Sequence, residues 1–159
     1  MSSILQILAE DGKCTTKEVA IRLGIEEADA DEKIKQYETD HVILGYHAVV
    51  DWTKAGAQHC FAFIEVCATP ERGHGFDRLA GHIAAFDEVH SIHLVSGTHD
   101  LNVVVEGQDF RDVALFVAEK LALLEGVRST STSFVLKSYK LEGRMIDDGQ
   151  EDRRLAVAP

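Results

Sequence analysis

The first half of the chain carries apolar residues at helical spacing in three short segments. The first begins near Ile4, and we expect it to end at Gly12 because glycine adopts left-handed dihedral angles at low cost. Thr15 or Thr16 is a suitable N-cap for the second segment, which Gly24 closes. The pattern therefore predicts two short helices followed by a third.

The third helix is predicted from about Glu27 to Asp40, and a stretch rich in β-branched and aromatic residues, 42–50, follows it. This stretch is typical of a strand pair or of a single strand leaving the helices. Three short helices and a strand suit a helix-turn-helix with a wing, and the tight Leu23-Gly24-Ile25 link favours it. A different small helical bundle fits the hydrophobic pattern equally well.

The second half changes to a mixed pattern of strands and amphipathic helices. Strands are expected at 60–66, 90–95, 101–105 and 131–138, and helix faces run through 76–86 and 113–124. The order β-α-β-β-α-β is that of a ferredoxin-like unit. A Val-x-Ser step follows each helix, at 89–91 and 127–129, as a faint internal repeat.

Several of these strands are apolar on both faces. Phe61 and Phe63 alternate with Ala62, Ile64 and Val66, and side chains of a strand point alternately to its two faces. Two helices cover one face of a sheet, so the second face needs another cover. A self-complementary dimer provides it most simply, and the linker or the tail is the alternative.

Composition places the chain among folded proteins with one medium or two small domains: 159 residues, of which 45% are hydrophobic. No apolar run reaches the roughly 18 residues of a membrane span, and Met1 to Ile4 lacks the basic start of a signal peptide. A cytoplasmic protein without membrane association is expected. The net charge of −11 argues against strong nucleic-acid binding, because such proteins are usually basic.

The residues that most often carry chemistry give little sign of an enzyme. Three cysteines form no paired framework and are expected to be packing residues, and neither Cys nor His spacing fits a zinc site. His90 and His93 are three apart on a predicted strand and so face opposite sides. No phosphate loop, nucleophile elbow or Ser-His-Asp order occurs, so no metal, cofactor or catalytic residue is expected.

The turn Ser96–Asp100 has two interpretations. It is a simple hairpin loop if Gly97 supplies a positive φ and Asp100 bonds its own backbone. It is a pocket if backbone N–H groups and Thr98 hold a carboxylate while Asp100 holds an ammonium group. His99 is then a ligand contact, or merely a polar turn residue. The residue pattern leaves these readings open.

Taken together, the chain resembles the Lrp/AsnC family of feast/famine regulators over roughly residues 3–141. The likeness is carried by an ordered set of short matches across both halves: Ile4-Leu-x-x-Leu8, Asp11-Gly12, Glu18-Val-Ala20, Arg22-Leu-Gly-Ile25, Val42-Ile43, Gly45-Tyr46-x-Ala48, His93-Leu-Val-Ser-Gly97 with Asp100, and Gly126-Val127 before the Ser/Thr run 129–133. Each match alone is weak, but their order is specific.

The resemblance implies an α+β protein with a winged helix-turn-helix over 1–50, a linker over 51–59, a ferredoxin-like effector (RAM) domain over 60–141 and a tail over 142–159. It implies a sequence-specific regulator that binds double-stranded DNA and responds to a small ligand, such as an amino acid. The family dimerises through its sheet and often assembles further, to octamers.

The resemblance also implies two sets of functional residues. The DNA-contacting set is Thr16, Lys17, Lys33 and Lys35. The effector-binding set is Ser96, Gly97, Thr98, His99, Asp100, Thr130 and Thr132.

The predicted recognition helix departs from the family pattern. Glu26 replaces the usual Ser cap, and Asp31 and Glu32 stand at usually basic positions. Segment 26–40 holds seven acidic residues against two lysines, a formal charge of −5. A metabolite-sensing module with weakened DNA binding is therefore the alternative function. A sirohaem decarboxylase of the same build would need a basic cluster for the tetrapyrrole carboxylates, which the sequence lacks.

Overall fold

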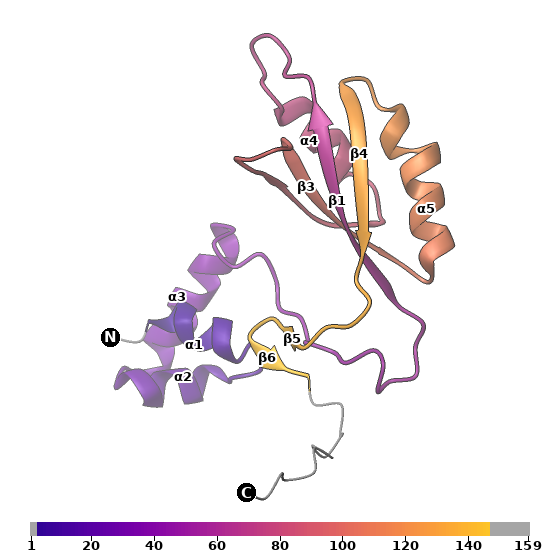
Figure 1. Ribbon diagram of the computed structural model, residues 1–159. Helices are drawn as coiled ribbons and strands as arrows, with labels where there is room; N and C mark the ends of the chain where they lie inside the picture. The colour runs from indigo at the N-terminus through magenta and orange to yellow at the C-terminus, as the bar shows by residue number, and fades with distance from the viewer. Residues whose placement is uncertain (1–2, 147–159) are drawn as a thin grey trace, which may run out of the picture. The chain divides into compact units, whose positions relative to one another are not determined.

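The computed structural model describes residues 3–146, and the remainder of the predicted tail lies outside them. The chain divides into two compact units, between Val49 and Val50 (Figure 1). The first unit is helical. The second is a sheet with helices, and each unit is described by itself.

The first unit contains helices α1 (Ile4–Glu10), α2 (Thr16–Leu23) and α3 (Glu27–Thr39). A capping box starts α2, because the Thr15 hydroxyl accepts the Glu18 N–H and the Glu18 carboxylate accepts the Thr15 N–H. Thr15, not Thr16, is therefore the cap. Gly24 ends α2 in the left-handed region, at φ 67°.

The helices enclose a small core in which α2 packs on α3. Val19 of α2 and Ala30 of α3 are fully buried. The other buried apolar residues are Ile4, Ile7, Leu8 and Ala20, with Leu23, Ile34, Tyr37 and Ile43 packed around them. The apolar stripes found in the sequence are therefore the faces that these helices bury.

Gly12 does not end α1 in the way expected. The C-cap of α1 is Asp11, whose backbone is extended, and Gly12 does not have a positive φ. A Cβ atom on Gly12 would lie 3.3 Å from the ring of Tyr46. Glycine at this position instead allows the Tyr46 ring to approach the backbone.

The prediction of a strand within 42–50 is wrong. The N–H groups of Val42 and Ile43 donate to the Tyr37 carbonyl at 2.8 and 3.0 Å, and residues 44–50 continue without strand pairing. β-Branched side chains favour an extended backbone, but a strand also needs a partner for its N–H and C=O groups. The described part of the chain provides none, and Leu44 is 91% exposed.

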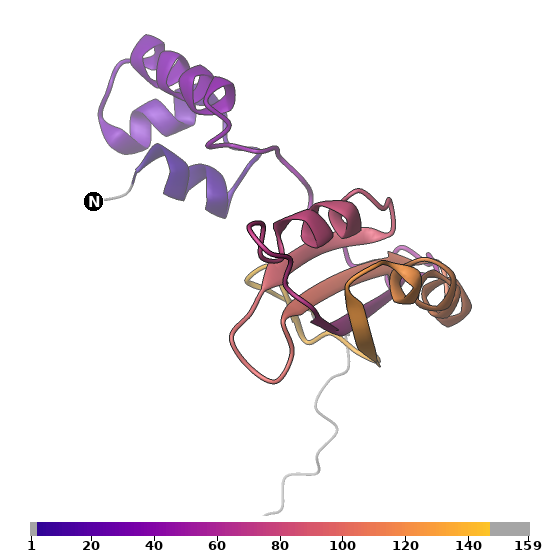
Figure 2. The same cartoon turned by 90° about the horizontal axis from the view of Figure 1, so that it is seen from above.

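The second unit has the predicted ferredoxin-like order. Its elements are β1 (Cys60–Ala68), α4 (Asp77–Ala84), β2 (Val89–Leu94), β3 (Leu101–Gly107), α5 (Phe110–Glu119), the 3-10 turn η1 (Leu121–Leu123) and β4 (Val127–Phe134), followed by the hairpin β5 (Lys140–Leu141) and β6 (Arg144–Met145). The four-stranded sheet is antiparallel, in the order β2-β3-β1-β4. Figure 2 shows this sheet with its helices.

The last strand of the sheet begins earlier than predicted. The sequence predicts a strand over 131–138, centred on the apolar residues 134–136, but β4 pairs with β1 over the Ser/Thr run instead. Beyond Phe134 only the Val135 N–H continues the pairing, to the Phe61 carbonyl. The hydrogen bonds available along β1 decided the position of the strand, and not the hydrophobicity of its residues.

The sheet has one helix-covered face and one open face. Ala62, Ile64 and Val66 are fully buried with residues of α4 and α5, whereas Phe63 on the opposite face is 47% exposed. The linker supplies part of the cover: Trp52 stacks on His59 at 5.2 Å, and His59 meets the Phe61 ring edge-on at 4.4 Å. The linker, which was the alternative to a dimer, therefore covers one end of the open face.

Candidate functional site

The two Val-x-Ser steps mark β-bulges. In β2 the pairing with β3 jumps from Val89 to Ser91, and in β4 the pairing with β1 jumps from Ser129 to Val127. The extra residues are His90 and Arg128. A bulge leaves its extra residue unpaired and redirects its side chain, so the repeat in the sequence marks two redirected polar side chains.

Asp100 fixes the turn between β2 and β3 to the end of β1. Its N–H donates to the Val66 carbonyl at 3.0 Å, and its Oδ2 accepts the Ala68 N–H at 2.8 Å. Its carbonyl accepts the Val95 N–H at 2.9 Å. The simple-loop interpretation is wrong in two details, because Asp100 bonds β1 and Gly97 has no positive φ.

Arg128 is the functional candidate that sequence reasoning missed. Its Nε donates to the Ala68 carbonyl at 3.2 Å, and its Nη2 lies 3.4 Å from Asp100 Oδ2. The side chain remains 61% exposed. The Val-x-Ser repeat was the available signal, because its middle residue in β4 is this arginine.

The other residues of the turn differ in their exposure to solvent. Ser96, Gly97 and Thr98 are exposed, and the Thr98 carbonyl accepts a weak bond from the Cys67 thiol at 3.8 Å. Both ring nitrogens of His99 are buried without a hydrogen-bond partner. Glu65 Oε1 lies 3.8 Å from His99 Nδ1.

Thr130 and Thr132 lie on the helix-covered side of β4. They stand opposite Val66 and Ile64 of β1, and directly opposed residues of an antiparallel pair share a face. Both threonines are half-buried. Among the described residues, no hydrogen bond joins either threonine side chain to the Ser96–Asp100 turn.

A second polar group surrounds the other bulge. His59 Nε2 is hydrogen-bonded to Glu106 Oε1, and His90 Nδ1 lies 3.7 Å from Glu106 Oε2. Phe61 lies between the two imidazoles in edge-on contact with each. This group ties the linker to β2 and β3.

The predicted DNA-contacting residues lie on α2 and α3. Thr16 is half-buried at the first position of α2, and Lys17 is exposed beside it. Lys33 Nζ lies 3.4 Å from Gln36 Oε1. Lys35 Nζ lies 2.6 Å from Asp31 Oδ2, and this hydrogen bond raises the pKa of Lys35. One of the two lysines of α3 is thus already paired.

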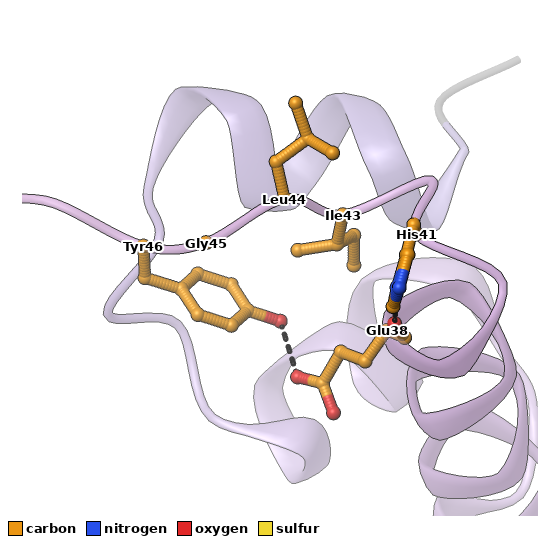
Figure 3. Close-up of a pocket in the computed structure, with 6 residues that line it drawn as sticks. All are labelled: Glu38, His41, Ile43, Leu44, Gly45 and Tyr46. Carbon is orange, nitrogen blue, oxygen red and sulfur yellow. Dashed lines mark hydrogen bonds between the residues drawn. The ribbon is translucent and has the colours of Figure 1, made fainter. Parts of the chain in front are cut away.

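An open hollow lies in the first unit, between the end of α3 and the segment that follows (Figure 3). Its lining comprises Glu38, His41, Ile43, Leu44, Gly45 and Tyr46. The Tyr46 hydroxyl donates to Glu38 Oε1 at 3.0 Å, and burial together with this carboxylate raises the pKa of Tyr46. The contact holds the extended segment against α3.

Two further findings concern residues 3–146. They contain no group of three or more His, Cys, Asp or Glu side chains placed to hold a metal ion. They also contain no helix with the length and apolar character needed to cross a membrane. The cysteines in this part are free thiols, and burial raises the pKa of the Cys60 thiol.

Comparison with known proteins gives consistent matches. The Lrp/AsnC ligand binding domain family matches residues 61–145. The chain is 41% identical over 159 residues to the uncharacterized HTH-type transcriptional regulator YugG of Bacillus subtilis, covering 99% of this chain and 96% of that protein. It is 29% identical over 140 residues to the proline dehydrogenase transcriptional activator of Rhizobium radiobacter, covering 88% and 89%.

The structure is also similar to solved structures. One is the transcriptional regulator NMB0573 of Neisseria meningitidis in complex with L-Met, with a TM-score of 0.69 and 25% identity. The match covers 92% of this chain and 94% of that one. The relatives named above are regulators and not enzymes.

Proposed function

The chain belongs to the Lrp/AsnC family, and we propose that it is a DNA-binding transcription regulator that responds to a small ligand, with amino acids as the ligand class. The main support is the 41% identity that spans both units, since the relative concerned is named as an HTH-type transcriptional regulator. The L-Met bound by the structural relative supports the ligand class.

The head is proposed to act as a helix-turn-helix. α2, the left-handed Gly24 and α3 form the pair, and α3 is the helix that enters the major groove. Thr16 and Lys17 at the start of α2, with Lys33 and Lys35 on α3, contact DNA. A wing would form only if residues 44–50 gain a strand partner from outside the described chain.

The effector is proposed to bind at the turn Ser96–Asp100. An amino acid carries a carboxylate and an ammonium group, and the turn offers backbone N–H groups beside the Asp100 carboxylate. Thr130 and Thr132, which follow the bulge of β4, belong to the proposed effector-binding set. His99 is also part of the proposed site, since both of its ring nitrogens are buried without a hydrogen-bond partner.

The open face of the sheet is proposed to form a symmetric dimer. Phe63 is 47% exposed there, and the linker covers only one end. The same face of a second copy would bury these apolar side chains, because a two-fold interface uses the same surface of both subunits. Light scattering should give a dimer or a larger assembly, and a monomer at micromolar concentration would contradict this interface.

The test of DNA binding is a fluorescence anisotropy titration of the full chain with the DNA upstream of its own gene, at several salt concentrations. Each phosphate contact steepens the log–log salt dependence by about one unit. The acidic α3 predicts a shallow slope per head, so that tight binding requires several linked heads. Repeating the titration with each amino acid identifies the effector through a change in DNA affinity.

A second function is favoured by the charge of α3 and its flanks. Segment 26–40 has a formal charge of −5, and Asp31 already engages Lys35. We therefore keep a metabolite-sensing oligomer with lost DNA binding as the alternative. Absence of DNA binding at low salt, together with retained amino-acid binding, would select it.

A further inference from the structure

The bulge of β4 places a cation at the proposed effector turn. Because Arg128 is the extra residue between the pairs Ser129–Cys67 and Val127–Ala68, its side chain is not part of the regular alternation of β4. It instead reaches the end of β1 and the last residue of the turn before β3. There it contacts the Ala68 carbonyl and Asp100 Oδ2.

These contacts use only part of the guanidinium. Arginine has five N–H donors in a planar fork, and two of them point to Ala68 and Asp100. Among the described residues the other donors have no partner, and 61% of the side chain is exposed. The backbone contact and the Asp100 contact hold the group in place, so its free donors are oriented in advance.

Arg128 is the basic side chain whose ion pair reaches the turn, through Asp100. Arg78 pairs instead with Glu71, and Lys120 pairs with Glu88. Asp100 and Arg128 therefore present one negative and one positive group side by side at the surface. An amino acid carries the complementary pair.

We propose that Arg128 binds the carboxylate of the effector, while Asp100 lies next to its ammonium group. The inference rests on the proposed function, because it assumes that the effector binds at the Ser96–Asp100 turn. A guanidinium fork matches a carboxylate geometrically, with two parallel N–H donors to two oxygens. Arg128 is thus a specificity-determining residue that selects ligands with a free carboxylate over their amides.

The test compares an acid with its amide on matched variants. Thermal shift of the full chain first ranks the twenty standard amino acids, beginning with L-methionine. Calorimetry then measures the best amino acid and its carboxamide on the unchanged protein, Arg128→Gln, Arg128→Lys and Arg78→Gln. Arg78 is the matched control, because it is also ion-paired and is 53% exposed.

We expect Arg128→Gln to weaken binding of the acid by about ten- to a hundredfold, the value of a charge-assisted hydrogen bond, and to leave binding of the amide unchanged. The affinity of Arg128→Lys for the acid should lie between those of the unchanged protein and Arg128→Gln, since lysine keeps the charge but lacks the planar pair of donors. Arg78→Gln should bind both as before.

Three results would overturn the proposal. If Arg128→Gln binds the acid normally, or loses acid and amide equally, Arg128 does not read the carboxylate, although the proposed function stands. If no amino acid binds the unchanged protein, the proposed ligand class fails and this inference fails with it.

Discussion

Replacing Asp100 by alanine should destabilise the second unit, and not only alter ligand binding. The side chain accepts the Ala68 N–H at 2.8 Å and pairs with Arg128 at 3.4 Å. Alanine leaves the Ala68 N–H without its acceptor, which costs about 1.5–3 kcal/mol for a bond to a charged group. The exposed pair with Arg128 adds about 0–1 kcal/mol.

The sum of these effects is about 1.5–4 kcal/mol, which corresponds to a melting temperature about 6–30 °C lower for a unit of this size. Asp100→Asn keeps an amide oxygen for the Ala68 N–H, so it should lose only about 1 kcal/mol. Asp87→Ala is the control, because Asp87 is exposed in the same unit and surface substitutions change stability by roughly 0.5 kcal/mol or less.

Urea unfolding followed by tryptophan fluorescence is the appropriate assay. Trp52 is the sole tryptophan of the chain and stacks on His59 within the second unit. The reasoning is refuted if Asp100→Ala is as stable as Asp87→Ala. It is also refuted if Asp100→Asn loses as much stability as the alanine variant, because the Ala68 hydrogen bond would then not be the cause.

Three further changes test other parts of the structure. Ile64→Ala should lower the free energy of unfolding by about 2–5 kcal/mol, because its side chain is fully buried; a loss below 1 kcal/mol in urea unfolding, on the order of a surface change, would place it outside the core. Glu88→Gln removes the carboxylate whose pKa Lys120 lowers, so the pair contributes stability above about pH 4.5 that is lost as pH falls through the folded-state pKa. The difference from the unchanged protein should be about 0–1 kcal/mol near neutrality and vanish in acid, and a difference independent of pH in urea titrations would exclude this pair as its source. Asp31→Ala should free Lys35 and raise DNA affinity severalfold at low salt, whereas unchanged anisotropy titrations would show that Lys35 does not contact DNA.

The capping residues and the spacing of apolar residues predict most of the helices and strands correctly. The Thr15 cap and the left-handed Gly24 are local features, so reading them requires no distant residue. Strand pairing is different, because a strand needs a partner. The prediction of a strand within 42–50 fails for this reason, because the segment has no partner among the described residues. For the same reason β4 begins four residues earlier than the sequence predicts.

The candidate site was only partly visible in the sequence. The family likeness pointed to the turn and to Asp100, but the binding partner of Asp100 is Ala68, which is 32 residues away. Arg128 was missed because its importance depends on a bulge that appears only when β4 is aligned with β1. The Val-x-Ser repeat is visible in the sequence, but only the strand pairing shows that it marks two bulges.

By itself, then, the sequence determined the periodic elements, their β-α-β-β-α-β order and the charge of α3, since these depend on residues close together in the chain. The tertiary structure alone decided which strand segments pair, where the bulges fall, and that Arg128 meets Asp100. The physical reason is that hydrogen bonds between strands join residues far apart in sequence, and one shift in register moves every side chain to the other face.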